Sequence, residues 1–429
     1  MPHGKGHRTR TLWLTGTLHA FTHLYQVALL PLYLRIEADL KLSSVEQATL
    51  LVSVLGLAYF LPSYPLGTLA DRMSRKKLLA LGLAINSLGF LGLSMAPNYS
   101  WALASAIVSG FGGSFYHPAA TALVARLFPE ARGRALGLVG IGASVGFCFG
   151  PMYTGWRVVM SGSWRAPVCE LGVLGLLAAG LFAWLADEEC PTPFSRELPS
   201  GAPPNGGATG RLFPSRSLWA FFLGASLALS LRDFAGSALS TSASLFLQYA
   251  HGFSPKFAGL ALAGIFLASA ISNPIFGSLS DKGRMRWGTF LLLAAALLVS
   301  VFPRVPVQWM PPVLLAYGFF FLATYPITEA ALMDAVPDAV RSRIFGLFIT
   351  VAGLVGNLSH WLVGGWIERL DEGASLADSY LPLYGVLSFM IVLSVTGLPL
   401  LHALRRREHL PEGRPGVAPL SALHSPDTP

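Results

Sequence analysis

The sequence predicts an all-α membrane protein with twelve transmembrane helices, arranged as two six-helix bundles that are related by a parallel repeat. Two observations support this prediction: long apolar runs recur along the chain, and two short elements of its first half return in its second half. Only 12% of the 429 residues are charged, and the mean hydropathy is +0.56. Soluble proteins carry about 25% charged residues, so this composition lacks the polar surface that water requires.

Each predicted helix is an apolar run of membrane-spanning length, which is about 20 residues. The first run is longer than the apolar core of a secretory signal, about 7–15 residues, so we expect it to be retained as a span. The runs lie at 12–34, 47–69, 77–96, 100–127, 134–160 and 166–186, and then at 217–249, 256–279, 287–303, 311–334, 344–367 and 380–403.

A segment rich in Pro, Gly and Ser, residues 187–216, separates the two sets of runs and is expected to be a flexible linker. It divides an N-terminal bundle, 12–186, from a C-terminal bundle, 217–404. Residues 1–11 form a short N-terminal segment, and the Pro-rich tail 405–429 is expected to be disordered. Lys and Arg cluster in both end segments, the linker and alternate loops, which predicts that all three lie in the cytoplasm.

An internal repeat relates the two halves. GTLADRMSRKK, which begins at Gly67, has a counterpart in GSLSDKGRMR, which begins at Gly277. FPEARGRALGL, from Phe128, similarly corresponds to VPDAVRSRIFGL, from Val336. Both pairs are about 210 residues apart. Parallel repeats of this kind occur in transporters.

The loop from Gly67 to Lys76 resembles the signature G-x-L-A-D-R-x-G-R-K/R of the major facilitator superfamily, with Ser74 at a position where glycine is usual. The resemblance covers residues 12–404 and implies a secondary transporter. Within the superfamily, Gly110 to Pro118 resembles the fourth helix of fosmidomycin-resistance-type bacterial drug exporters.

The same loop is expected to hold a conformational latch, as the superfamily resemblance implies. Asp71 can accept hydrogen bonds from the N-terminus of a neighbouring helix, where the helix dipole favours negative charge. A plain positive-inside loop would explain the arginines but not a Gly and an Asp at this spacing. The predicted latch comprises Gly67, Asp71, Arg72 and Arg75, with the weaker counterpart Gly277, Asp281 and Lys282.

The predicted fifth helix carries glycines at a spacing that lets two helices approach closely. The pattern resembles the G-x-x-x-G-P motif of proton antiporters and therefore favours export, although ordinary packing of small residues is the alternative. The residues are Gly142, Gly146, Gly150, Pro151 and Gly155.

Ionisable residues inside the membrane are the strongest candidates for function, because each costs about 2.5–3.5 kcal/mol at the centre of a helix. Arg232 and Asp233 lie near the middle of the seventh run, and His19 and His23 share one face of the first. We expect Asp233 with one of the two histidines to be the proton site, and Arg232 to hold Asp233 or an anionic substrate. A purely structural ion pair is the alternative.

A second candidate pair consists of His117 in the fourth run and Glu329 in the tenth, each near a proline. A role in the cavity and a role in packing or gating are both open.

The sequence contains no phosphate-binding loop, no zinc-protease helix and no nucleophile elbow, so we expect no enzyme, no cofactor and no metal site. We also expect no binding of nucleic acid. The prediction is a monomeric transporter in the bacterial inner (plasma) membrane that exports a small amphipathic or anionic compound by alternating access, coupled to protons. The alternatives are a proton symporter or facilitator that imports a metabolite, and a receptor without transport activity.

Overall fold

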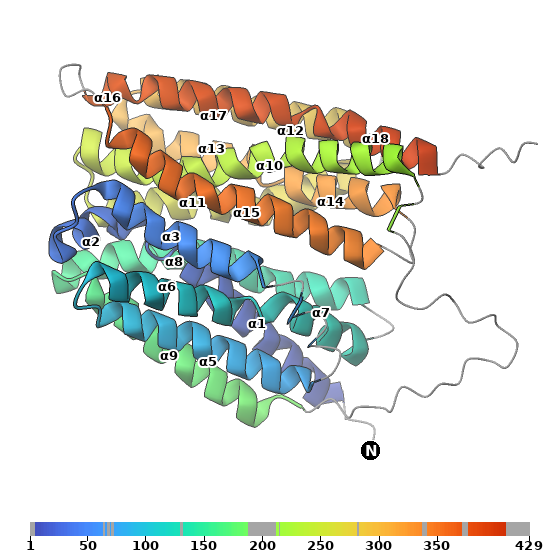
Figure 1. Cartoon of the computed structure of the whole chain (residues 1–429), viewed down its shortest axis with the longest axis horizontal. Coiled ribbons are helices and arrows are strands. Elements are labelled where there is room, and N and C mark those ends of the chain that lie inside the picture. The colour runs from blue at the N-terminus through green and yellow to red at the C-terminus, as the bar shows by residue number, and fades with distance from the viewer. Residues whose placement is uncertain are drawn as a thin grey trace, which may run out of the picture.

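The computed structural model describes residues 5–62, 65–66, 69, 73–128, 132–187, 212–213, 215–280, 283–336, 341–370 and 376–408. Within these ranges every regular element is a helix. The helices run side by side along the long axis of the molecule, and α1 (Lys5–Val27) begins at the end where α18 (Gly397–Glu408) finishes (Figure 1). We call this the terminal end and the other the distal end.

The first half of the chain, up to residue 187, fills the lower part of Figure 1. After α1, its helices are α2 (Tyr33–Leu40), α3 (Val45–Phe60), α5 (Arg75–Ser94), α6 (Tyr99–Gly113), α7 (Tyr116–Leu127), α8 (Arg132–Ser161) and α9 (Arg165–Leu185).

The second half, from residue 212, fills the upper part of Figure 1. Before α18, its helices are α10 (Arg216–Leu245), which continues into a π-helical turn (Phe246–Ala250), α11 (Pro255–Ser280), α12 (Arg284–Val301), α13 (Met310–Phe321), α14 (Thr324–Ala335), α15 (Arg341–Ile367), α16 (Leu376–Ser379) and α17 (Leu381–Ser394).

Several predicted runs agree closely with helices, because charged loops bound them. The run 77–96 corresponds to α5 and the run 166–186 to α9. At the chain ends the helices reach further than expected: α1 starts inside the segment 1–11, and α18 continues into the tail 405–429. Most of the linker and tail lie outside the described residues.

The runs 100–127 and 311–334 are each broken into two helices, for the same physical reason. Pro118 and Pro326 have no backbone N–H, so the carbonyls of Ser114 and Leu322, four residues earlier, lose their helical partners. The chain turns at these two points and the helix restarts immediately afterwards as α7 and α14. The breaks place His117 at the second residue of α7 and Glu329 near the middle of the short helix α14.

Nine helical segments in the described part of the chain are long and apolar enough to cross a membrane. The first, second and fourth predicted runs are not among them. Histidines and other polar residues along α1 lower its hydropathy, α3 has only 16 described helical residues, and the break after Gly113 divides the fourth run. The nine are Arg75–Ser94, Ala135–Ser161, Arg165–Leu185, Arg216–Ala250, Pro255–Ser280, Arg284–Arg304, Val307–Ala335, Ile344–Ile367 and Ala377–Arg406.

Large apolar side chains also project outward from these helices. Leu177, Trp184, Leu227, Leu297 and Phe389 are each more than half exposed. An exposed apolar surface of this extent marks a membrane or protein contact in a folded protein. Together with the nine apolar segments, it indicates an integral membrane protein.

The glycines of α8 lie against two different helices. A β-carbon on Gly142 or Gly146 would collide with the backbone of α1, at Gly16 and Ala20 respectively. Gly155 instead meets α11 of the second half, where its β-carbon would lie 3.3 Å from the Cα atom of Gly259. One helix thus packs tightly on its own half near its middle and on the opposite half at the distal end.

Candidate functional site

A central cavity of about 520 Å³ lies between the two halves. Its lining comes from both halves and includes His23, His117, Arg232, Asp233 and Glu329. Aromatic and aliphatic side chains, among them Phe147, Phe266 and Tyr325, supply much of the remaining wall. The cavity therefore offers a largely apolar chamber with a few ionisable groups, which is typical of small-molecule sites.

Hydrogen bonds between α3 and α15 close the distal end of this cavity. The backbone N–H of Val45 donates to Glu368 at 3.1 Å, and the indole N–H of Trp361 donates to Glu46 at 2.5 Å. Deeper in, the Ser53 hydroxyl donates to the Asn357 carbonyl at 2.6 Å. We call these contacts the distal seal.

A second connection crosses the interface nearby. The Tyr33 hydroxyl lies 3.1 Å from the Thr241 hydroxyl, which lies 2.6 Å from Nδ1 of His360. The Ser244 hydroxyl also donates to the Leu30 carbonyl at 2.6 Å. His360 lines the cavity, so this network forms part of its distal floor.

The opposite side of the cavity is open. His117 and Glu329 are exposed although they lie within helices. An added β-carbon on Gly140 of α8, which lines the cavity, would meet nothing within 4 Å. With the distal end sealed, the structure represents a conformation that opens toward the terminal end.

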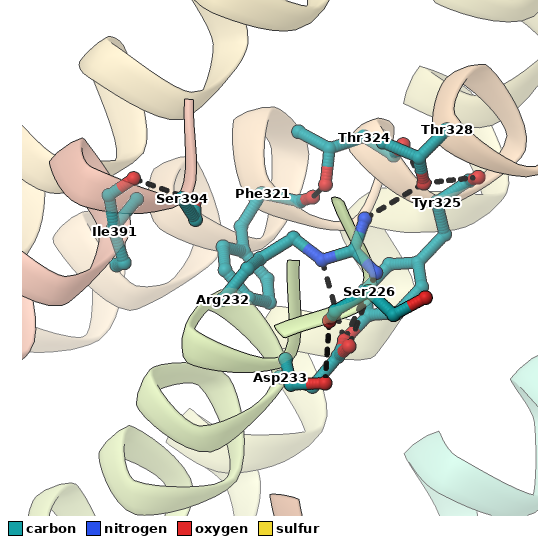
Figure 2. Close-up of polar contacts among 10 residues, drawn as sticks. Ser226, Arg232, Asp233, Phe321, Thr324, Tyr325, Thr328, Ile391 and Ser394 are labelled. Carbon is teal, nitrogen blue, oxygen red and sulfur yellow. Dashed lines mark hydrogen bonds and ion pairs between the residues drawn. The ribbon is translucent and has the colours of Figure 1, made fainter. Parts of the chain in front are cut away.

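Arg232 is the centre of the first charged cluster (Figure 2). Its guanidinium donates to Asp233 from Nε at 3.2 Å and from Nη2 at 3.0 Å, while Nη1 donates to the Thr328 hydroxyl at 2.8 Å. The guanidinium also lies over the Tyr325 ring, 4.0 Å from its centre. Arg232 is 1% and Asp233 8% exposed, so the pair joins α10 to α14 almost without solvent.

Glu329 follows Thr328 on α14 and points into the cavity. Among the described residues its carboxylate has no hydrogen-bond or ion-pair partner. It is therefore a carboxylate available to a cation or a proton, one residue from the side chain that holds Arg232.

Three histidines form the second cluster. The Nε2 atoms of His19 and His23 are 3.0 Å apart, and the His117 ring lies 5.3 Å from that of His19 and 5.5 Å from that of His23. His23 and His117 line the cavity, whereas His19 lies behind them, with Nδ1 2.9 Å from the Val139 carbonyl and its ring stacked on Tyr116.

The structure thus arranges the predicted residues differently from the expected pairs. His117 lies with His19 and His23, and Glu329 lies with Arg232 and Asp233. Both clusters line one cavity, and the hydrogen bonds of each remain within its own half of the chain. A direct meeting of Asp233 with a histidine stays a prediction.

The predicted latch falls largely outside the described residues. Gly67, Asp71, Arg72, Asp281 and Lys282 are in this group. Arg75, at the start of α5, is 4% exposed, and Gly277 of α11 has open space around it. In the described part of this end, Arg284 forms an ion pair with Asp334.

Sequence reasoning missed the groups of the distal seal. Glu46 and Glu368 occur near predicted helix ends, where charged residues are common, and Ser53 and Asn357 have no distinguishing pattern. His360 stands alone in its run and reads as a core residue. Only the packing of α3 on α15 brings these groups together.

A bundle of apolar helices around an open cavity with buried charges defines a membrane transport protein. The family model described as Major Facilitator Superfamily matches residues 12–360. The chain therefore belongs to this superfamily, as its sequence predicted, and is a transporter rather than an enzyme.

Relatives in bacteria carry resistance names. The chain is 28% identical over 327 residues to "Multidrug resistance protein 2" of Bacillus subtilis, which covers 75% of this chain and 80% of the relative. It is 24% identical over 366 residues to "Quinolone resistance protein NorA" of Staphylococcus aureus, with 83% and 87% covered.

Solved structures share the fold. A bacterial homologue of the human lysosomal transporter Spinster, in an inward-facing and unoccupied conformation, aligns with a TM-score of 0.74 and 19% identity, over 94% of this chain and 98% of that one. A mutant of the peptide transporter POT, in complex with sulfate, aligns with a TM-score of 0.71 and 16% identity, over 92% and 94%.

Proposed function

We propose that this transporter exports small amphipathic or anionic compounds from the cytoplasm in exchange for protons. The resistance names of its bacterial relatives support export. The cavity volume of about 520 Å³ suits a drug-sized ligand, since such pockets measure about 300–1,000 Å³.

In this proposal the transporter is a monomer whose twelve helices form two six-helix bundles. The two bundles rock about the cavity, which opens alternately to either side of the membrane. Basic residues at both chain ends support a cytoplasmic location of the termini, in a protein of the bacterial inner membrane. The cavity would then open inward, the side from which an exporter loads. The contacts of the distal seal would break when the transporter opens outward.

Coupling would reside in the Arg232–Asp233 pair and Glu329. Protonation of Asp233 removes the charge that Arg232 neutralises, while Thr328 and Tyr325 still hold the guanidinium in place. The uncompensated positive charge can then attract Glu329, so that neither carboxylate is left to accept from a donor group of an amphipathic substrate. Proton binding and substrate binding would thereby compete for the carboxylates that line the cavity, which is the basis of exchange. The carrying observation is this nearly solvent-free ion pair beside an unpaired carboxylate that faces the cavity.

The test uses purified transporter in proteoliposomes with an imposed proton gradient and a fluorescent quinolone as the probe. We expect quinolone-dependent proton flux in the wild type. Asp233→Asn should abolish gradient-driven accumulation but retain exchange of quinolone without a gradient. Ser240→Ala is the matched control, since Ser240 also lines the cavity and, among the described residues, its hydroxyl bonds to no group but the Gly236 carbonyl of its own helix.

The direction of the proton flux separates export from uptake. If the transporter exchanges substrate for protons, protons and quinolone must move in opposite directions. Movement in the same direction would establish the symport alternative. Gradient-driven accumulation that persists in a well-folded Asp233→Asn protein would overturn the assignment of the coupling site.

A further inference from the structure

We propose that His19, His23 and His117 form a binding site for a divalent transition-metal ion of the zinc class. The site opens onto the central cavity. It does not depend on the direction of transport or on proton coupling, so it can be tested apart from the proposed function.

The first step is the direction of the hydrogen bonds at the outer nitrogens. The carbonyl of Val139 can only accept, so Nδ1 of His19, 2.9 Å away, must carry the proton. The side-chain oxygen of Gln26, 3.1 Å from Nδ1 of His23, likewise only accepts, so this nitrogen also carries a proton. Both neutral rings then have an unprotonated Nε2.

The second step is the contact between these two Nε2 atoms. They lie 3.0 Å apart, so two lone pairs face each other at hydrogen-bond distance. Such a contact is repulsive unless a positive charge lies between or beside the two atoms. A metal ion supplies that charge, and imidazole nitrogen is a preferred ligand of Zn²⁺, Cu²⁺ and Ni²⁺.

The third histidine distinguishes a metal from a shared proton. One ring nitrogen from each of the three residues lies within 4.8 Å of the others. Zn–N bonds of about 2.0–2.1 Å place tetrahedral ligand atoms about 3.3 Å apart, so a modest movement of His117 completes the set. His117 is exposed to the cavity, which gives the ion an entry path and leaves a fourth position open to the chamber.

The surroundings match those of metal-binding histidines in general. A histidine ligand usually donates its second ring N–H to a carbonyl or carboxylate, which fixes the ring and makes the inner nitrogen more basic. Val139 fills this role for His19 and Gln26 for His23. His19 and His23 lie side by side because residues four apart on a helix such as α1 share one face.

The competing arrangement rotates the Gln26 amide, so that its nitrogen donates to His23. His23 would then donate from Nε2 to His19, and no cation would be required. The two arrangements predict opposite results in a metal titration.

The experiment uses the full chain in detergent, purified without a polyhistidine tag, stripped with a chelator and titrated with Co²⁺. Tetrahedral Co²⁺ absorbs strongly in the visible range, unlike the hydrated ion. We expect one equivalent to give these bands, Zn²⁺ to displace them, and His117→Ala to abolish them. His360→Ala, a histidine variant in the same cavity, should leave them unchanged.

A graded variant makes the test independent of folding defects. Gln26→Ala should weaken Co²⁺ affinity by about 10–100-fold, the usual loss for a residue that orients a ligand, while Gln26→Glu should restore or tighten it. Absence of stoichiometric tetrahedral Co²⁺ in the wild type, or bands that persist in a monodisperse His117→Ala protein, would overturn the proposal in favour of the rotated amide.

Discussion

The Glu368 carboxylate, just beyond the end of α15, accepts a hydrogen bond from the backbone N–H of Val45, the first residue of α3. The first N–H groups of a helix have no partner within the helix, and the side chain of Ser44 does not supply one here. A residue of the second half therefore caps a helix of the first. This cap exists only while the distal end is closed.

We predict that Glu368→Gln lowers the ratio of closed to open distal ends by about two- to fivefold, since a charge at a helix N-terminus contributes about 0.3–1 kcal/mol. Spin labels at the exposed positions Met95 and Val307, with Cys148, Cys169 and Cys190 replaced, report the separation of the two halves by pulsed electron resonance. Arg369→Ala, at the neighbouring exposed residue, is the control. An unchanged distance distribution in Glu368→Gln would remove the cap from the seal.

Acid should favour the closed distal end. Glu37, on α2 outside the spanning segments, is half-buried, and this burial together with the nearby Glu368 carboxylate raises its pKa above the ordinary range. Opening would separate the two carboxylates and expose Glu37, which returns its pKa toward about 4.3. The closed form therefore binds the proton more tightly and gains population as the pH falls from 7 toward that value.

The same spin labels test this sign. In Glu37→Gln the closed population should be higher at pH 7 and should respond less to acid. Glu368→Gln also removes the repulsion between Glu368 and Glu37. Burial is the larger cause of the raised Glu37 pKa, so this repulsion is the smaller effect. Loss of the α3 cap should therefore dominate in Glu368→Gln. A closed population that falls with acidification would contradict the prediction.

The close contact of Gly155 with Gly259 leads to a prediction about conformational locking. A side chain at Gly155 would strike the backbone of α11 at Pro255, which only separation of the two helices relieves. Gly155→Val should therefore disfavour the closed distal end and shift the spin-label distances outward. Gly137→Ala, on the same helix in open space, should leave them unchanged; a similar shift in both variants would mean that helix α8 itself had been disturbed.

The sequence predicted the helices better than it predicted the site. Helix positions follow from local alternation of apolar runs and charged loops, which is why α5 and α9 agree within two residues. Even the breaks at Ser114 and Leu322 have a local signal, the prolines four residues later. The approach of His117 to His19 and His23 has none, because it depends on how α7 packs on α1 after the break. The residues of the distal seal were unpredictable for the same reason.

Removing one partner of the Arg232–Asp233 ion pair should destabilise the protein strongly, whereas removing both charges should destabilise it little. Arg232→Met leaves the Asp233 carboxylate buried without its cation, which typically costs about 3–5 kcal/mol. Adding Asp233→Asn to this variant removes the uncompensated charge and should recover most of the loss. The stability of Arg232→Lys should lie between those of the double variant and Arg232→Met. A lysine ammonium keeps the positive charge but does not reproduce the planar guanidinium, which contacts Asp233 and Thr328 while it stacks on Tyr325.

Thermal unfolding in detergent measures this order of stability directly: wild type, double variant, Arg232→Lys, then Arg232→Met. Equal stability of the single and double variants would mean that Asp233 takes up a proton once Arg232 is gone, and a steeper pH dependence of unfolding in Arg232→Met would identify that proton.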